Sequence, residues 1–302
     1  MRKVLRPRTC MLHLILTRFN VRSGGREQPI RERRDWLAQR FELFDTFCFP
    51  SVAAQTRKDF RWIVFFDAHT PEPFRSRIEQ YRQLPQFTPL FVDGWEKRIV
   101  FPTLRAMARP GDQEILTTRL DNDDGLHSRY VERLREEVER RGRGFYNFST
   151  GLVYCGGRVY QHADPSNAFM SALEPVTACR TVWRKPHTDI CETQVVHQVE
   201  MPHAWLQVIH GTNVSNRVRG VRVSPAVVRD GYGALTRMTF REDSEIQRWL
   251  DNHLLRFVRA QRDALVRTGR RLARRTRQQP IAPPPPPPPP VEAPVEASRS
   301  RA

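Results

Sequence analysis

Residues 114–125 read EILTTRLDNDDG, an apolar stretch that runs directly into a cluster of acidic side chains. The apolar and β-branched residues 115–118 are typical of a buried strand. Asp121, Asp123 and Asp124 then follow within four positions. Like charges this close repel, so one carboxyl group would keep its proton unless a cation lies beside it. Mg²⁺ and Mn²⁺ prefer such oxygen ligands and keep coordination positions open for phosphate oxygens.

The acidic cluster also has a simpler interpretation. Asp-Asn-Asp-Asp-Gly is a good turn sequence, and an Asp at the beginning of a helix caps it. The buried strand ahead of the cluster favours a metal site without excluding the turn. Both interpretations therefore stay open at the level of these residues alone.

Strand and helix patterns alternate on both sides of this stretch. This alternation predicts the α/β class, with a mostly parallel sheet flanked by helices. We expect strands at residues 11–17, 60–66, 88–92 and 114–120, and one or two strands over residues 144–155. We expect helices at residues 33–49, 51–56, 71–81, 103–108 and 128–140. In open sheets of this kind, ligands bind beyond the carboxyl ends of the strands. Residues 17–20, 67–69 and 121–124 should therefore meet at one edge of the sheet.

The charge of the chain indicates an anionic partner. The 302 residues carry a formal net charge of +17, which suits nucleotide diphosphates, anionic lipid, acidic polysaccharide or nucleic acid. The segment 256–277 holds nine Arg and one acidic residue. Residues 243–277 have a helical pattern with Arg on one side and apolar residues on the other, which fits a helix lying on an anionic membrane and equally a solvated helix packed on the domain.

Three regions follow from these compositional changes. Residues 1–242 are expected to form the catalytic domain, and residues 243–277 a basic amphipathic helix. Eight consecutive prolines at residues 283–290 cannot pack as a core, so residues 278–302 are expected to form a disordered tail.

The cysteines and the hydropathy predict the compartment. None of the five Cys forms a CxxC pair, which suits reduced thiols in a cytosolic protein. No stretch approaches the length of a transmembrane helix. We therefore expect a cytoplasmic protein, soluble or peripheral to the inner face of the plasma membrane.

Three stretches together resemble the putative rhamnosyl transferases, over about residues 10–220. They are FPSVAAQTRKDFRW at residues 49–62, followed by Asp67; TRLDNDD at residues 118–124; and HGTN at residues 210–213. The resemblance implies a GT-A-like fold, a divalent metal (Mn²⁺ or Mg²⁺) and a nucleotide-sugar donor such as dTDP-rhamnose. It also implies a glycan or lipid-linked acceptor.

The resemblance assigns roles to particular residues. Asp67 would contact the nucleotide base or ribose, and Asp121 would hold ribose or metal-bound water. Asp123 would ligate the metal, Asp124 would be a second ligand, and His210 would complete the metal shell. One departure stands out: Ala68 and His69 follow Asp67, where related transferases have a second Asp.

Several further side chains are candidates for donor binding. Thr17 and Arg18 end the first predicted strand, and Arg57 lies in the first family-like stretch. Arg suits bidentate binding of phosphate oxygens. Arg119 is a weaker candidate, because we expect it to point away from Asp121 on the pleat.

An inverting transferase needs a carboxylate that takes the proton of the acceptor hydroxyl. Asp189 is the first candidate and Glu192 the second. Asp189 is expected near the beginning of a helix over residues 194–199. Asp189 could instead only cap that helix.

Two other function classes compete with glycosyl transfer. A metal-dependent phosphoryl hydrolase or nuclease would also use clustered Asp, but it needs a second acidic cluster for a two-metal site. A non-enzymatic nucleic-acid-binding protein would use the Arg-rich C-terminal segment. We expect transfer of rhamnose or another hexose, and no specific nucleic-acid partner.

Overall fold

The computed structural model describes residues 10–22, 33, 35–211, 217–262 and 264–265. Residues 1–259 form one compact unit, and residues 260–302 form a second. Most of the second unit lies outside the described residues, including the end of the expected basic helix and the whole proline-rich tail.

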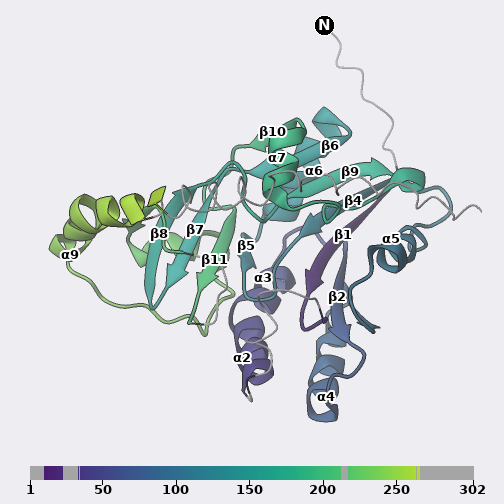
Figure 1. Ribbon diagram of the computed structural model, residues 1–302, viewed down its shortest axis with the longest axis horizontal. Helices are drawn as coiled ribbons and strands as arrows, with labels where there is room; N and C mark the ends of the chain where they lie inside the picture. Colours follow the sequence, from purple (N-terminus) through teal and green to yellow (C-terminus); the bar gives the residue numbers. More distant parts are fainter. Residues whose placement is uncertain (1–9, 23–32, 34, 212–216, 263, 266–302) are drawn as a thin grey trace, which may run out of the picture. The chain divides into compact units, whose positions relative to one another are not determined.

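A seven-stranded sheet forms the centre of the first unit, in the order β10-β6-β9-β4-β1-β2-β3 (Figure 1). All of its neighbouring strands are parallel except where β9 pairs with β4 and β6. The strands are β1 (Met11–Arg18), β2 (Arg61–Asp67), β3 (Phe87–Val92), β4 (Glu114–Arg119), β6 (Gly144–Phe148), β9 (Ser171–Pro175) and β10 (Val196–Val199). The expected α/β class with a mostly parallel sheet is confirmed.

Helices cover both faces of this sheet, which explains why its strands read as continuous apolar runs. Successive side chains of a strand point to opposite faces, and Trp62 and Ile63 on β2 accordingly belong to different core clusters. The first cluster includes side chains from α2 (Trp36–Leu43), α4 (Glu72–Gln80) and α6 (Tyr130–Arg141). The second includes side chains from α5 (Lys97–Arg105) and α7 (His187–Thr193).

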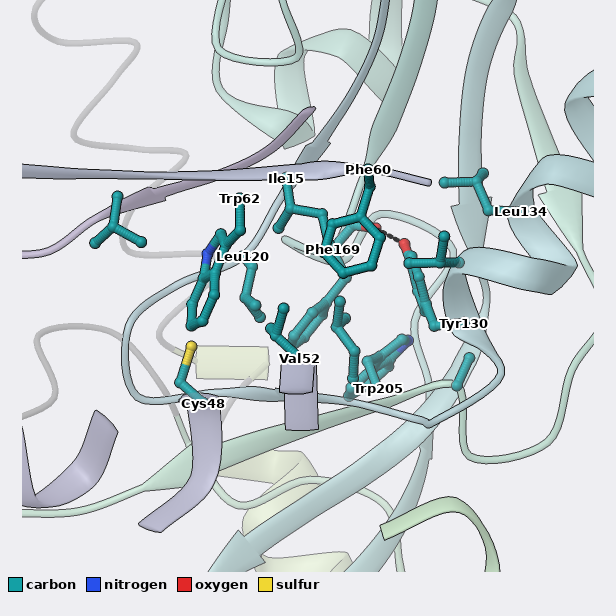
Figure 2. Packing of buried hydrophobic residues seen from close by; sticks show 14 of the residues in the cluster. Ile15, Cys48, Val52, Phe60, Trp62, Leu120, Tyr130, Leu134, Phe169 and Trp205 are labelled. Carbon is teal, nitrogen blue, oxygen red and sulfur yellow. Dashed lines mark hydrogen bonds between the residues drawn. The ribbon is translucent and has the colours of Figure 1, made fainter. Parts of the chain in front are cut away.

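Aromatic packing joins the helices to the sheet in the first cluster. A π-helix at Phe44–Cys48 leads into α3 (Phe49–Ala53), and the ring of Phe44 stacks on Trp62 with centroids 5.3 Å apart. Figure 2 shows Trp62 above Cys48 and Val52 in this core, and the hydroxyl of Tyr130 donating to the Phe169 carbonyl oxygen at 2.7 Å.

A second sheet of five strands has the order β12-β8-β7-β11-β5. Its strands are β5 (Gly125–Leu126), β7 (Thr150–Cys155), β8 (Arg158–Ala163), β11 (Trp205–Ile209) and β12 (Val221–Val223). Residues 121–124 run from β4 of the first sheet to β5 of the second. The acidic stretch is therefore the connection between the two sheets, and β11 brings His210 to it.

The C-terminal part of the first unit contains short helices. α8 (Arg229–Tyr232) is followed by α9 (Glu245–Leu250) and a π-helix at Asp251–Leu255. Ser244 caps α9 by accepting a hydrogen bond from the Gln247 amide. Across the part of the chain that is described, no helix combines the length and the apolar character that a membrane span requires.

Two expectations about local structure were wrong. The helix expected at residues 194–199 is strand β10, and the nearby helix is α7, which ends at Thr193. The helix expected at residues 103–108 begins earlier, at Lys97, and ends at Arg105. In the first case, the four residues VHQV of β10 are too few to distinguish a strand from a helix, and pairing with β6 decides the outcome.

Candidate functional site

The carboxyl ends of β1, β2 and β4 meet at one edge of the first sheet, as expected. Asn20, just beyond β1, accepts a hydrogen bond from the Asp67 amide at 3.0 Å and donates to Thr70 at 3.0 Å. Asn122, just beyond β4, donates to the Phe19 carbonyl oxygen at 2.7 Å. Two Asn side chains thus join the segments 17–20, 67–69 and 121–124 through their amide groups.

Asp67 is the last residue of β2 and is almost fully buried. One carboxylate oxygen accepts from the His69 amide at 2.8 Å, and the other accepts from Arg22 at 2.9 Å. The backbone therefore fixes the carboxylate, while the exposed Arg22 side chain can move. A ligand with a hydroxyl or amide donor could replace Arg22 at this oxygen.

Asp123 forms the centre of the site. Its carboxylate oxygen Oδ2 lies 2.8 Å from His210 Nε2 and 2.9 Å from an Arg40 guanidinium nitrogen. The side chains of Asp123, Arg40 and His210 are 8%, 14% and 16% exposed. Arg40 also donates to Asn122 at 3.3 Å. These side chains come from α2, from the end of β4 and from the end of β11, so the site forms only in the complete fold.

Asp121 and Arg119 form a bidentate ion pair, with nitrogen-to-oxygen distances of 3.1 and 2.9 Å. The expectation that Arg119 points away from Asp121 was wrong, because residues two apart in an extended chain lie on the same side. Burial, the largest single effect, raises the pKa of Asp121, but the charge and hydrogen bond of Arg119 and the neighbouring positive groups together bring the pKa below the ordinary value. Arg18 and His187 also act on Asp121 electrostatically.

Aromatic rings position Arg18. Its guanidinium lies 5.2 Å from the centroid of Trp95 and 5.9 Å from that of Trp183. The two indoles pack edge to face, with centroids 4.8 Å apart. A guanidinium on aromatic faces is held by cation–π attraction while its N–H groups stay directed sideways. Arg18 is therefore placed beside Asp121 by rings of the second core cluster.

Asp124 is buried and faces the second sheet. Its carboxylate oxygen Oδ1 accepts from the Val208 amide on β11 at 2.8 Å. Burial, followed by the charges of Asp123 and Asp121, raises the pKa of Asp124 well above its ordinary value. The repulsion between carboxylates that the sequence predicts is therefore present in the fold.

The donor chemistry around Asp123 and His210 fits a divalent cation. A carboxylate oxygen and an imidazole nitrogen 2.8 Å apart can both ligate Mn²⁺. Within residues 10–22, 33, 35–211, 217–262 and 264–265, no group of three or more His, Cys, Asp or Glu side chains is arranged to hold a metal ion. The predicted set of Asp121, Asp123, Asp124 and His210 is thus not gathered into one cage, and a cation would take most of its ligands from substrate and water.

Thr17 and Arg57, which were predicted to bind the donor, contact other protein side chains instead. Thr17 is fully buried, and its hydroxyl accepts a hydrogen bond from the Trp62 indole at 3.0 Å. Arg57 pairs with Asp59 at 2.6 Å, just before β2 begins, whereas Asp67 ends this strand. A seven-residue strand spans about 20 Å, so Arg57 lies at the opposite edge of the sheet and we leave it out of the proposed site.

The candidate bases lie on α7. Asp189 is in the first turn of α7, partly buried, and accepts a hydrogen bond from the Thr188 hydroxyl at 3.2 Å. No side chain caps the beginning of α7, so the capping role considered for Asp189 is absent. Glu192 is exposed in the next turn. His187 begins the helix, and burial lowers its pKa.

Arg40 was not identified from the sequence, and Asn20 and Asn122 were included in the converging segments without a role for either. Arg40 lies within an apolar helical pattern, where it reads as a solvated side chain, and only the tertiary fold brings it to Asp123. The Asn residues did carry a signal, because each follows a predicted strand at its carboxyl end.

Known proteins share sequence or structural similarity with this chain. A family model described as "Putative rhamnosyl transferase" matches residues 13–222. The crystal structure of S. aureus TarS 1-349 shares 10% sequence identity, with a TM-score of 0.33, over 48% of this chain and 37% of that chain. The structure of TarS 1-349 in complex with UDP-GlcNAc gives 11% identity and a TM-score of 0.33, over 48% and 36% of the two chains. No curated protein sequence matches the chain.

Proposed function

We propose that this chain transfers a glycosyl group from a nucleotide-sugar donor to an acceptor hydroxyl. The chain belongs to the "Putative rhamnosyl transferase" family, whose model covers residues 13–222. In this reaction, the bond between the sugar C1 and the diphosphate oxygen of the donor breaks. A new bond forms between C1 and an acceptor hydroxyl oxygen, and the hydroxyl proton leaves. The proposed donor is a nucleoside diphosphate rhamnose, with dTDP as the first candidate, and the acceptor is a glycan or a lipid-linked sugar.

The single observation that carries this proposal is the Asp123–His210 pair beside Arg40 at the carboxyl edge of the sheet. This edge is where open parallel sheets bind nucleotides. The family membership supports rhamnose as the proposed sugar, and the Arg side chains around the site suit a diphosphate.

The chain's own residues would bind the donor at two places. Asp67, fixed by the His69 amide, would accept hydrogen bonds from the nucleoside, with Asn20 holding the strand ends in register. Arg18 and Arg119 lie around Asp121 and would contact diphosphate oxygens. Guanidinium groups suit this role because their paired N–H donors match phosphate oxygens.

Asp123 and His210 would hold a divalent metal ion, with Mn²⁺ or Mg²⁺ as candidates. A metal ion at this place neutralises the charge that develops on a leaving diphosphate. Arg40 already lies against Asp123 and would keep the carboxylate oriented. This arrangement accords with a GT-A-like transferase.

Asp189 is the proposed base that accepts the proton of the acceptor hydroxyl. It lies in the first turn of α7, two residues after His187, and His187 interacts electrostatically with Asp121. The first turn of α7 is therefore on the same side as the proposed diphosphate site. Glu192 is one turn further along and is the second candidate.

Calorimetric titration with dTDP, UDP and GDP, with and without Mn²⁺, tests the site. Asp123→Ala should weaken Mn²⁺-dependent binding of the preferred nucleotide by about tenfold or more. Glu79→Gln on α4 removes an exposed carboxylate that pairs with Arg82 and should bind like the wild type. Nucleotide binding that is equal in wild type and Asp123→Ala, or that ignores Mn²⁺, would refute this site.

Donor turnover separates the two base candidates. Asp189→Asn should lower kcat while the affinity for the nucleotide stays unchanged, because the proton acceptor acts in the chemical step. Glu192→Gln serves as its matched control. A larger loss of kcat in Glu192→Gln would transfer the role to that residue.

A phosphoryl hydrolase or nuclease with two metal ions needs a second acidic cluster. In the described part of the chain, no such cluster accompanies Asp121–Asp124. The nucleic-acid reading depends on residues 256–277, most of which lie outside the described residues. We propose the cytoplasm as the compartment, because nucleotide-sugar donors and the five unpaired Cys suit it.

A further inference from the structure

The C-terminal helical segment of the first unit packs on the protein with its polar side. Asp251 is only 2% exposed. Its carboxylate lies 2.5 Å from Arg259 and 3.3 Å from Arg222, and it accepts from the Tyr160 hydroxyl at 3.2 Å. Asp243 also contacts Arg222. Asp243, Asp251 and Arg259 of this segment are thus paired with opposite charges inside the protein.

The Asn252 side chain holds the segment against the backbone of β12, the edge strand of the second sheet. Asn252 accepts from the Arg222 amide at 2.7 Å and donates to the Arg222 carbonyl oxygen at 3.0 Å. Arg222 is the central residue of β12, so Asn252 occupies hydrogen-bonding positions that a further strand would use. This edge of the sheet is therefore closed by a helix.

The other side of the segment is apolar and faces solvent. Ile246 is 71% exposed, Phe257 is 64% exposed and Trp249 is 55% exposed. Leu250, Leu254 and Val258 are exposed next to them. Residues at spacings of three and four share one side of a helix, so these six side chains form one surface, which we call the apolar helix face. A helix normally buries its apolar side, and this one does the reverse.

The charge pattern decides which partner this face suits. Arg256 is exposed within the same segment, and beyond the paired Arg259 the sequence continues with seven more Arg up to residue 277. A second copy of the chain would bring the same positive charges together and be repelled. An anionic phospholipid surface accepts apolar side chains and attracts Arg at the same time.

We propose that the apolar helix face of residues 245–258 docks on an anionic phospholipid membrane. Ile246, Leu254 and Phe257 would enter the boundary between headgroups and acyl chains. Trp249 would lie at the headgroup level, where indoles are enriched, and Arg256 would contact lipid phosphates. The buried Asp251 cluster holds the segment with this face outward.

Vesicle sedimentation of the full chain tests the proposal. The vesicles are phosphatidylcholine alone, or phosphatidylcholine mixed with phosphatidylglycerol. The test variant is Trp249→Glu with Phe257→Glu. The matched control is Ile99→Glu with Val195→Glu, which changes the net charge equally at exposed apolar residues outside the segment.

The wild type should bind vesicles that contain phosphatidylglycerol, and the test variant should lose about tenfold or more of its partition coefficient. The control should bind like the wild type, and unchanged thermal melting of both variants excludes misfolding. Equal binding of test and control variants would overturn the proposal, as would equal binding to vesicles without phosphatidylglycerol. A concentration-dependent dimer without lipid that only the test variant abolishes would overturn it in favour of a second copy.

Discussion

Removal of the Asp251 carboxylate should destabilise the protein strongly. The side chain is 2% exposed and touches two guanidinium groups, of which Arg222 is 4% exposed and Arg259 is 16% exposed. Asp251→Ala leaves both cations without this partner in a poorly solvated place. The Tyr160 hydroxyl also loses its acceptor.

The magnitude follows from the cost of removing a buried carboxylate that Arg259 and Arg222 share, although Arg222 keeps its contact with Asp243. Removing one partner of a buried ion pair typically costs about 3–5 kcal/mol. For a chain of this size, a loss of about 3–5 kcal/mol lowers Tm by about 6–20 °C. If the segment after Ser244 detaches instead, water reaches Arg222 and Arg259. The loss in global stability is then smaller, and the segment becomes accessible to protease.

Urea unfolding and limited trypsin digestion measure both outcomes. Asp93→Ala is the control, because Asp93 is 78% exposed and its removal should cost less than about 0.5 kcal/mol. Asp251→Ala should lose stability, or be cleaved faster at Arg256, or both. Unfolding and cleavage indistinguishable from those of Asp93→Ala would refute the role of the buried cluster.

Three further predictions concern the sheets and the site. Burial lowers the pKa of His13 from 6.5 to about 3. Between these two pH values only the unfolded chain takes up the proton. The free energy of unfolding should therefore fall by about 1.4 kcal/mol for each pH unit below pH 6.5. Urea unfolding at several pH values should show a shallower fall in His13→Gln, and an identical fall would contradict this account. Gly151→Ala would place a Cβ 2.0 Å from the indole on β11 and should cost about 1–3 kcal/mol in unfolding free energy, whereas Gly211→Ala meets nothing within 4 Å and should cost little. Arg119→Gln should raise the pKa of Asp121, measured by carboxyl ¹³C NMR titration, and an unchanged pKa would show that the ion pair is not formed.

The central strands could be predicted because both of their faces are buried. Residues 62–66 are a continuous apolar run and residues 115–118 are apolar or β-branched, and a stretch of this length between turn residues fits a buried strand. The acidic residues after them mark the carboxyl edge, so the place of the site followed from strand order and chain direction alone.

The second sheet and the antiparallel strand could not be predicted in the same way. β9 and β12 are short, and their side chains are fixed by partners far away in sequence, such as Leu116 opposite Leu173. Residues 194–199 were predicted as a helix because six residues are too few for their hydrophobic periodicity to distinguish a helix from a strand. Pairing with β6, not local preference, makes them a strand.

Site residues next to a predicted strand could be identified from the sequence, whereas those that only tertiary packing brings to the site could not. Asp121, Asp123 and Asp67 could be proposed because a carboxylate after a buried strand has few structural uses. Arg40 could not, since a single Arg on a helix has no local feature that distinguishes it from a solvated one. The relation between Arg119 and Asp121 was misjudged from the pleat, although their separation of two residues places them on one side.

The position of β9 between β4 and β6 has a consequence for synthesis on the ribosome. His13, Thr118 and Ser171 are linked through their side chains across β1, β4 and β9, at 3.0 and 2.8 Å. β4 is complete at Arg119, but its partner β9 is complete only at Pro175. At 5–20 residues per second, the nascent chain therefore carries β4 with one unpaired edge for about 3–11 s. Such an edge is a template for aggregation, so chaperone capture competes with misassembly during this interval.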